Sequence, residues 1–353
     1  MNKILLSFQL VTSMLYYKDL ENKIFTKHEL TSEEPDELII ISGFVGPSPL
    51  SRLKDLDFKV TVIGGMYSGG MNKTLWKSIE KIKNENENLT ILFSNIEIHS
   101  KIYIWRREGK VLTALIGSAN FSSNGLRNDF RESLAEATRD TFEPLNEYYG
   151  FIKINSTPTP QLKESNSITI DFTEIGETKN LQNNIKYSCD LPLYSTSRNK
   201  VQEKGGLNWG FSSGHVAEGD AYIALPKDII RENPMLFKPY DEDYEFKGSK
   251  KKRNSEPIEI IWDDGYIMDA SFEGNQIIDG RQFPKQLASY SAKNPTINDE
   301  RISKKSILGR YLRKRLNVEV NHQITCEVLE KYGRNYITLS LIDDGIYYAD
   351  FSV

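Results

Sequence analysis

The sequence predicts two domains of different fold class, an α/β sandwich followed by an all-β pseudobarrel with a short helix. In the first half, apolar strand-like runs alternate with helical stretches, an order that places helices on a mixed sheet. In the second half, short strands are separated by turns, which is typical of a small barrel. A chain of 353 residues is long enough for two hydrophobic cores.

The elements of the first half follow from runs rich in Ile, Leu, Val and aromatic residues. The predicted strands are 37–44, 58–65, 89–93, 98–105 and 111–116. A helix is expected over 74–84, between the second and third strands. Strands that are apolar along most of their length indicate a sheet buried on both faces.

A change of composition divides the chain. From about Asn155 to Asn184 the residues are mostly polar, so we expect one domain over 1–176, a linker over 177–186 and a second domain over 187–353. The predicted strands of the second domain are 221–225, 258–262, 324–328 and 336–341. Apolar residues at helical spacing predict one helix over 304–316.

Composition limits the classes of function. The formal net charge is -4, so any surface for nucleic acid must be a local basic patch. Only Cys189 and Cys326 are present, and the four histidines show no metal-ligand spacing, which argues against a disulfide framework and a zinc site. The apolar run at 4–8 is too short to span a bilayer. We therefore expect a cytoplasmic protein without membrane association, metal or cofactor.

Two short motifs carry the predicted chemistry. His99-Ser100-Lys101 begins one strand-like run, and Gly117-Ser118-Ala119-Asn120 ends the next. Side chains two apart on a strand project to the same face, so His99 and Lys101 are expected to lie side by side. An imidazole can attack phosphorus, and an adjacent ammonium can stabilise the negative charge that develops on the phosphoryl oxygens.

The pairing of HxK with GSxN resembles the phospholipase D superfamily. The resemblance implies that Ser118 and Asn120 donate hydrogen bonds to phosphoryl oxygens and catalytic groups. It also implies an acid after the Asn that accepts the second ring N–H of His99. Glu132 fits this role best, and Glu136 is the alternative.

One position separates branches of that superfamily. Phospholipases usually carry an Asp five residues after the Lys, and Arg106 stands there in this chain. The sequence therefore resembles the restriction endonucleases of the BfiI and NgoFVII type, which lack that Asp. The resemblance implies a type II-like restriction endonuclease that cleaves DNA at specific sequences.

Two segments of the second domain are predicted to read DNA. They combine Arg, Lys, Asn and Gln, which recognise base edges in the major groove, with aromatic residues. The strings GLNWG and RQFPK resemble the B3-like domain of the same endonucleases, a β-barrel that grips the major groove with two arms. The predicted contacts are Ser197, Arg198, Lys200, Lys204, Asn208, Trp209, Arg281, Gln282, Lys285 and Gln286.

Because a phospholipase D site normally combines two HxK motifs and this chain has one, the resemblance implies a homodimer through the N-terminal domain. One His99 would form a phosphohistidine with double-stranded DNA while the other protonates the leaving oxygen, with no divalent metal. Whether a separate ATPase subunit takes part is left open.

Three alternatives remain at this point. Asp36, Asp57 and Lys59 fit the permissive pattern of a Mg²⁺-dependent PD-(D/E)xK nuclease. A phospholipase D-type phosphodiesterase without sequence specificity would share the HxK chemistry, and a non-catalytic DNA-binding protein would not need it. A basic segment lies in the second domain. Its seven basic residues between Arg301 and Leu316 could neutralise phosphates or form the solvated face of a helix.

Overall fold

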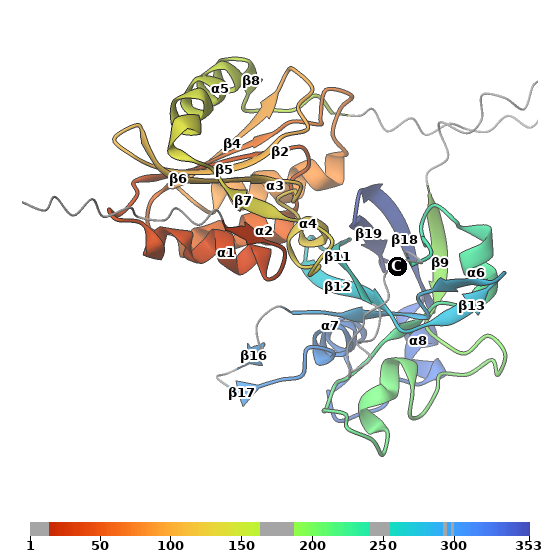
Figure 1. Ribbon diagram of the computed structural model, residues 1–353. Helices are drawn as coiled ribbons and strands as arrows, with labels where there is room; N and C mark the ends of the chain where they lie inside the picture. The colour runs from red at the N-terminus through yellow and green to blue at the C-terminus, as the bar shows by residue number, and fades with distance from the viewer. Residues whose placement is uncertain (1–13, 163–186, 241–254, 292–294, 298–299) are drawn as a thin grey trace, which may run out of the picture.

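The strands in the first half of the chain are apolar along most of their length and bury both faces of the sheet. In the computed structural model, which describes residues 14–162, 187–240, 255–291, 295–297 and 300–353, this half forms an eight-stranded mixed sheet. The strand order is β1-β7-β6-β5-β2-β3-β4-β8, with β2, β3 and β4 parallel to one another. The sheet is flanked by helices on both faces, as the sequence predicts (Figure 1).

The elements of this first domain run in an order that alternates strands with short helices. They are β1 (Leu15–Tyr16), α1 (Leu20–Thr26), η1 (Lys27–Leu30), β2 (Glu37–Ser42), α2 (Pro47–Arg52), η2 (Leu53–Asp55), β3 (Lys59–Gly64), α3 (Lys73–Asn84), β4 (Leu89–Ser94), β5 (Lys101–Arg107), β6 (Lys110–Gly117), α4 (Ser123–Leu126), β7 (Leu134–Glu136), η3 (Arg139–Thr141), α5 (Phe142–Ile154) and β8 (Ser156–Thr157).

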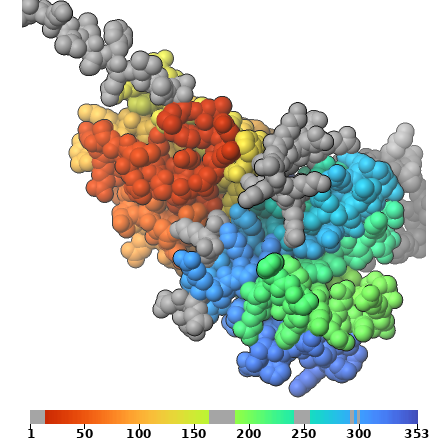
Figure 2. Space-filling view, turned by 60° about the horizontal axis from the view of Figure 1, so that its bottom comes forward, coloured from red at the N-terminus to blue at the C-terminus, as the bar shows by residue number. Residues whose placement is uncertain are grey.

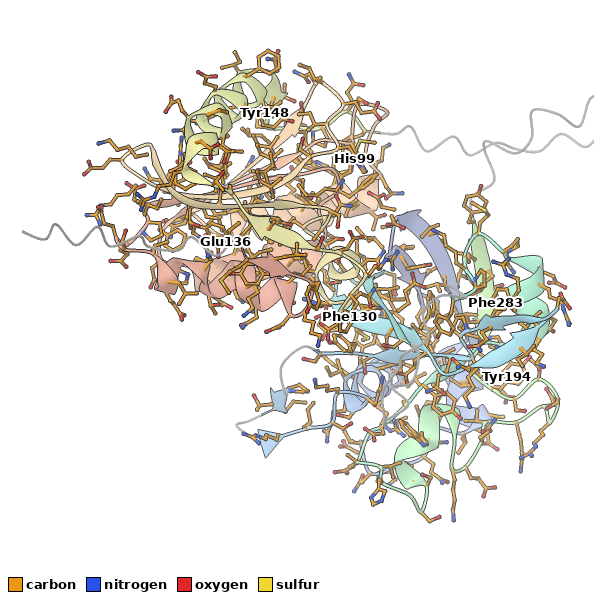
Figure 3. The ribbon with its side chains drawn as sticks, viewed as in Figure 1. His99, Phe130, Glu136, Tyr148, Tyr194 and Phe283 are labelled. Carbon is orange, nitrogen blue, oxygen red and sulfur yellow. The ribbon has the colours of Figure 1, made fainter. Side chains whose placement is uncertain are left out.

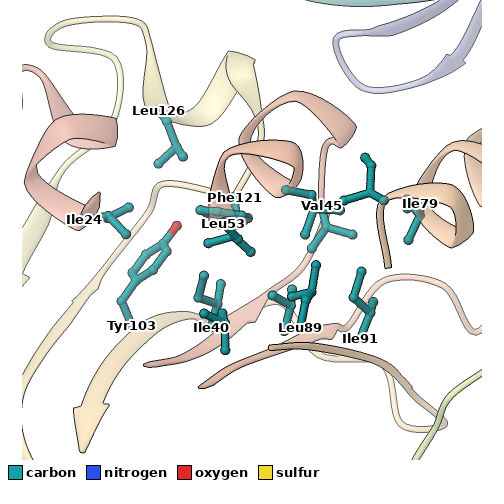
Figure 4. Close-up of a cluster of buried hydrophobic side chains, with 14 of the residues drawn as sticks. Ile24, Ile40, Val45, Leu53, Ile79, Leu89, Ile91, Tyr103, Phe121 and Leu126 are labelled. Carbon is teal, nitrogen blue, oxygen red and sulfur yellow. The ribbon is translucent and has the colours of Figure 1, made fainter. Parts of the chain in front are cut away.

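The two faces of the sheet have separate cores. Leu38 and Ile40 of β2 pack with α1, α2 and α3, as Figure 4 shows for part of this cluster. Ile39 and Ile41 of the same strand pack instead against α5. The period-2 alternation of a strand produces this division. It also fixes the register, because a slip of one residue would exchange the two sets.

The second domain is a strand-rich, nearly closed barrel-like sheet. Seven strands follow the order β10-β15-β12-β11-β19-β18-β9, in which β11 and β19 are parallel. Its elements are β9 (Ser188–Pro192), η5 (Gly206–Phe211), β10 (Ile223–Ala224), α6 (Lys227–Glu232), β11 (Ser255–Trp262), β12 (Ile267–Glu273), β13 (Gln276–Ile278), β14 (Arg281–Phe283), β15 (Gln286–Ser289), β16 (Thr296–Ile297), β17 (Glu300–Arg301), α7 (Ser306–Leu316), α8 (Cys326–Tyr332), β18 (Tyr336–Asp343) and β19 (Ile346–Asp350).

One predicted strand of this domain is wrong. The segment 324–328 was expected to be extended, but Cys326–Tyr332 forms helix α8. The Thr325 hydroxyl accepts a hydrogen bond from Val328 N–H and caps the helix, and Gly333, with φ +96°, ends it. The predicted linker at 177–186 lies outside the described residues, so the boundary at residue 176 stays a prediction.

The two domains share a packed junction. Ile261 of β11 and Ile346 of β19 belong to the same buried cluster as the α1–α3 face of the first domain. Around them, Arg127 forms an ion pair of 2.6 Å with Asp269 of β12. Figure 2 shows the two bodies in contact along this boundary. Among the described residues, no helix is long and apolar enough to cross a bilayer.

Replacing Ile91 by Ala tests the core on the α1–α3 face. Ile91 of β4 is fully buried, so the smaller side chain should leave a cavity and lower the free energy of unfolding by about 2–5 kcal/mol. Leu30→Ala is the matched control because Leu30 is 75% exposed. Chemical denaturation of both variants measures the difference, and equal stability of the two would contradict the assigned burial.

Candidate active site and nucleic-acid interface

The ends of four strands converge at one edge of the first sheet. Ser42, the last residue of β2, pairs with Gly64 at the end of β3 and with Lys101 at the start of β5. Ile102 of β5 pairs in turn with Ile116, one residue before the end of β6. The segments that follow β2 and β6 and precede β5 therefore meet at this edge, and they contain both predicted motifs.

His99 and Lys101 are in contact. Strand β5 begins at Lys101, so His99 lies in the loop just before it and not within the predicted strand. Lys101 Nζ lies 3.0 Å from His99 Nδ1 and donates to the His99 carbonyl oxygen at 2.6 Å. The imidazole is exposed, whereas Lys101 is only 5% exposed. The pair therefore presents the His99 ring to solvent, while the Lys101 ammonium is buried beside it.

Burial changes the acid–base properties of this cation. It lowers the pKa of Lys101, and the nearby Glu132 carboxylate opposes that change. The same carboxylate acts with burial to raise the pKa of Tyr103. Glu132 therefore lies within electrostatic reach of the His99–Lys101 pair, although the atom at His99 Nδ1 is Lys101 Nζ and not the expected carboxylate oxygen.

Asn120 reaches the same site from the segment after β6. Its Oδ1 accepts a hydrogen bond of 3.2 Å from Phe44 N–H and lies 3.4 Å from the Ser42 hydroxyl. With this oxygen held by the chain after β2, the amide NH₂ is the end that can donate to a phosphoryl oxygen. Two side chains predicted to act together, His99 and Asn120, are thus brought to one place by different strands.

The close approach of His99 and Asn120 depends on Gly43, a residue that the motif-based predictions missed. A Cβ atom at Gly43 would lie 3.2 Å from Asn120 Oδ1 and 3.4 Å from His99 Cδ2. Gly43 therefore lies between the imidazole and the amide. The predicted strand that ends at Gly43-Phe44 held the signal, since a glycine at such a strand end often marks a close backbone approach.

Ser118 has structural contacts in this arrangement, and its hydrogen bond to a phosphoryl oxygen stays a prediction. Its hydroxyl accepts a hydrogen bond of 3.1 Å from Ser133 N–H, and its own N–H donates to Ser133 O at 3.0 Å. These contacts fix the segment that carries Glu132 beside the end of β6. Tyr103 OH completes the support by donating to Ala119 O at 2.8 Å.

The alternative acid, Glu136, lies elsewhere. It accepts a hydrogen bond of 2.6 Å from Tyr16 OH and forms an ion pair of 2.6 Å with Lys27. These partners lower the pKa of Glu136 against the effect of its burial. Figure 3 places Glu136 and His99 on different sides of the domain.

The residues of the PD-(D/E)xK pattern lie at the opposite end of the sheet. Asp36 precedes β2 and accepts a hydrogen bond from Glu108 N–H, while Lys59 begins β3. Asp57 is exposed in the turn before that strand. In the part of the chain that the structure describes, no three His, Cys, Asp or Glu side chains are grouped to hold a metal ion. Arg106, nearby, pairs with Glu37 and stacks on Tyr149.

The two predicted recognition segments form exposed turns of the barrel. Ser195 and Lys200 bridge a turn whose residues 196–199 are exposed, and Ser197, Arg198 and Lys200 project from it. The second segment is the β13–β14 hairpin, closed by Asp279 and Gly280, both with positive φ. Arg281 and Gln282 are exposed on this hairpin, and Lys285 follows it.

The first of these segments borders a cavity of about 200 Å³ beside β10. Leu193, Tyr194, Gly206 and Tyr222 are among the residues that line it. Leu225 N–H, just after β10, donates to Lys285 O at 2.9 Å, so the cavity wall is tied to the second recognition segment. Figure 3 shows Tyr194 and Phe283 on the same side of the domain.

Asn208 does not belong to this exposed set. It is 1% exposed, its Nδ2 donates to the carbonyl oxygens of Gln202 and Ile324, and its Oδ1 accepts from Ile324 N–H and from Arg313. Its amide is therefore occupied within the core, and we remove it from the proposed DNA contacts. Two others are constrained: Gln286 donates to Glu273 at 2.8 Å, and Trp209 packs edge-on against Tyr222.

The basic stretch 301–316 is divided between structure and surface. Arg313 is 1% exposed and bonded to Asn208, and Arg315 forms an ion pair of 2.7 Å with Asp263. Lys305 pairs with Glu273. These three cations bind the barrel together, so the stretch as a whole is not the phosphate-neutralising patch that its composition allows.

The fold and the site together define a phospholipase D-type phosphodiesterase domain joined to a barrel. Family models agree on both parts: the N-terminal phospholipase D domain of the NgoFVII restriction endonuclease matches residues 18–169. The C-terminal B3-like DNA-binding domain of the same enzyme matches residues 180–343. The chain therefore belongs to the NgoFVII restriction endonuclease family of the phospholipase D superfamily, and it is a nuclease.

Solved structures with a similar first domain include NucT from Helicobacter pylori, which is 18% identical with a TM-score of 0.31 and matches 41% of this chain and 97% of its own. The phospholipase D family member Nuc from Salmonella typhimurium is 14% identical, with a TM-score of 0.30 over 41% of this chain and 96% of its own. No curated protein matches the sequence.

The buried amide of Asn208 predicts a stability defect and not a recognition defect. Asn208→Ala should lower the free energy of unfolding by about 2–3 kcal/mol, because it leaves the buried Arg313 and three backbone groups without their partner. Lys204→Ala, at an exposed position nearby, should change it by less than about 0.5 kcal/mol. Denaturation curves that do not separate the two variants would return Asn208 to the set of surface contacts.

Proposed function

We propose that this protein is a type II-like restriction endonuclease that hydrolyses DNA phosphodiester bonds through a phosphohistidine intermediate without a divalent metal. The observation that carries the proposal is the meeting of His99, Lys101 and Asn120 at one sheet edge, with Gly43 between the imidazole and the amide. A nucleophile, a cation and an amide donor brought together at one place suit an attacked phosphate.

In the first step, His99 Nε2 attacks phosphorus and forms a P–N bond as the bond from phosphorus to the leaving sugar oxygen breaks. The partner subunit's His99 donates a proton to that oxygen. In the second step, the partner subunit's His99 removes a proton from water, which attacks phosphorus and releases His99. Each step is a displacement that conserves atoms and charge, and no oxidant or nucleotide is consumed.

Attack through Nε2 requires the ring proton to be on Nδ1. In the structure Lys101 Nζ occupies that position, 3.0 Å away. We infer that a bound phosphate draws the ammonium toward its oxygens, and that Glu132, already within electrostatic reach, then accepts a hydrogen bond from His99 Nδ1–H and holds that proton on the ring. Lys101 and the Asn120 amide would together hold the phosphoryl oxygens.

The proposal includes a homodimer through the N-terminal domain, because the two-step chemistry needs a second imidazole. Of the four histidines in the chain, His28 packs edge-on against Phe58, and His215 and His322 lie in the second domain. A second copy supplies the missing group by two-fold symmetry. An additional ATPase subunit is not needed for this chemistry.

Sequence recognition is assigned to the two exposed segments of the barrel. Their cations and amides are the groups that read base edges bidentately or contact phosphates. The proposed contacts are Ser197, Arg198, Lys200, Lys204, Trp209, Arg281, Gln282, Lys285 and Gln286.

Cleavage of plasmid DNA in excess EDTA tests the metal-independent mechanism. The wild-type protein should cut at defined sites, and His99→Ala should lose cleavage while it still binds DNA. His215→Ala, a change at an exposed histidine of the second domain, is the control and should cut normally. If EDTA stops the wild-type enzyme, or if His99→Ala still cuts, the mechanism is excluded.

Glu132 and Glu136 should respond in opposite ways to replacement by Gln. Glu132→Gln should slow cleavage by about 100-fold or more with stability unchanged. Glu136→Gln should keep cleavage but lower stability at pH 7 by about 1 kcal/mol.

The stability deficit of Glu136→Gln should depend on pH. Because the folded-state pKa of Glu136 is depressed, the contribution of its ionised form is present at neutral pH and is lost as the pH falls through that pKa. Thermal unfolding from pH 7 to pH 3 measures this. If Glu136→Gln slowed cleavage and Glu132→Gln did not, the orienting role would belong to Glu136.

A further inference from the structure

A carboxylate of the second domain is buried against the active-site segments of the first. Glu259 of β11 is 1% exposed. Its two oxygens accept separate backbone hydrogen bonds, from Ser48 N–H at 2.8 Å and from Ser123 N–H at 2.9 Å. One side chain therefore binds two segments that are far apart in sequence and belong to the other domain.

These two segments are the ones that hold Asn120. The first follows β2, and its Phe44 N–H is bonded to Asn120 Oδ1. The second follows Asn120 directly, where Ser122 N–H donates to Asn120 O. They run parallel through a bridge between Val45 and Phe121, and Gly46 N–H donates to Phe121 O at 2.8 Å.

The contact is close packed. A Cβ atom at Gly46 would lie 2.1 Å from a Glu259 carboxylate oxygen, so only glycine allows the approach. Gly345, in the turn beside β19, makes a second, less close approach, because a Cβ atom there would lie 2.9 Å from the Asn124 side chain. The segments near Asn120 thus contact the second domain at two points, Glu259 and Gly345.

We propose that Glu259 is a positioning residue for cleavage: from the recognition domain, it clamps the 44–48 and 120–123 segments and so sets the orientation of the Asn120 amide. The proposal rests on the proposed nuclease function, because it assigns a role to Asn120 in that chemistry. A contact that served only the fold would not need to reach the site. The Glu259 contact does reach it, because only two hydrogen-bonded segments separate this recognition-domain side chain from Asn120.

The surroundings of Glu259 make the clamp sensitive to pH. Arg127, Asp269 and Tyr67 are the ionisable groups that face it from the adjoining elements. Burial raises the pKa of Glu259 to about 7, with the two N–H donors and Arg127 opposing the rise and Asp269 adding to it. Above that pH both oxygens accept hydrogen bonds. Below it, one oxygen carries a proton and no longer accepts well.

The test compares Glu259→Gln with wild-type protein in single-turnover cleavage at saturating protein. At pH 8 the variant should cut about 10- to 100-fold more slowly, because a small displacement of Asn120 costs rate. Its dissociation constant for the same DNA should stay within about twofold of wild type. A contact that served only the fold would not separate rate from affinity in this way.

The pH dependence gives an independent readout. The ratio of wild-type to variant rates cancels every titration that the two proteins share. It should be large at pH 8 and fall toward one as the pH drops through about 7, where Glu259 becomes protonated and resembles the glutamine. A ratio that does not change with pH would overturn the proposal.

Glu256→Gln is the matched control. Glu256 lies on the same strand at the same junction, but its ion-pair partner is the Arg131 side chain at 3.6 Å and not the backbone of the clamped segments. It should cut at the wild-type rate. Equal loss in both variants would show that the domain junction matters and that Glu259 has no special role.

Hydrogen exchange separates this proposal from the proposed function. The Ser48 and Ser123 amides should exchange faster in Glu259→Gln than in wild type, whether or not either protein cuts DNA. If the wild type cuts nothing, the nuclease mechanism fails, yet unchanged exchange at these amides would still overturn the clamp. If the wild type cuts and the variant matches it, only the clamp is wrong.

Discussion

The pairing of β2 with β5 is the constraint on which the site depends. Both strands are buried on both faces, so each residue has one permitted side and a slip by one position would place apolar side chains wrongly throughout. That register sets Ser42 opposite Lys101. It turns Lys101 to the face shared by Tyr103 and brings the loop with His99 to the strand ends. The hydrophobic effect, acting over the whole sheet, thereby fixes a polar contact that contributes little to stability itself.

The central strands could be predicted from sequence because their signal is local. The segments expected at 37–44, 58–65 and 89–93 agree with β2, β3 and β4 within two residues, and helix α3 differs from its prediction by one. The strand expected at 324–328 was wrong because three alternating apolar positions in five residues are too few to distinguish a strand from a short helix. There the cap at Thr325 decided the outcome.

The residues of the candidate site that belong to short sequence motifs could be predicted, and the others could not. His99, Lys101 and Asn120 were found because HxK and GSxN are recognisable motifs, and the structure brings them together at the ends of the adjacent strands β5 and β6. Gly43 and Glu259 carry no motif, since their importance comes from distances between segments that only the folded chain defines. Asn208 shows the reverse case: an amide in a loop-like string suggested a base contact, yet its donors and acceptors are used inside the barrel.

The way Glu259 occupies backbone donors of the neighbouring domain limits how freely such enzymes can be rebuilt from parts. A barrel of different specificity grafted onto this nuclease half would meet the Ser48 and Ser123 N–H groups without an acceptor unless it carried an acid at the equivalent place. Each orphaned donor would cost about 1–3 kcal/mol. A change of target specificity in this architecture therefore requires that the residues of the domain junction be transferred together with the DNA-recognition segments. The barrel cannot be exchanged independently of that junction.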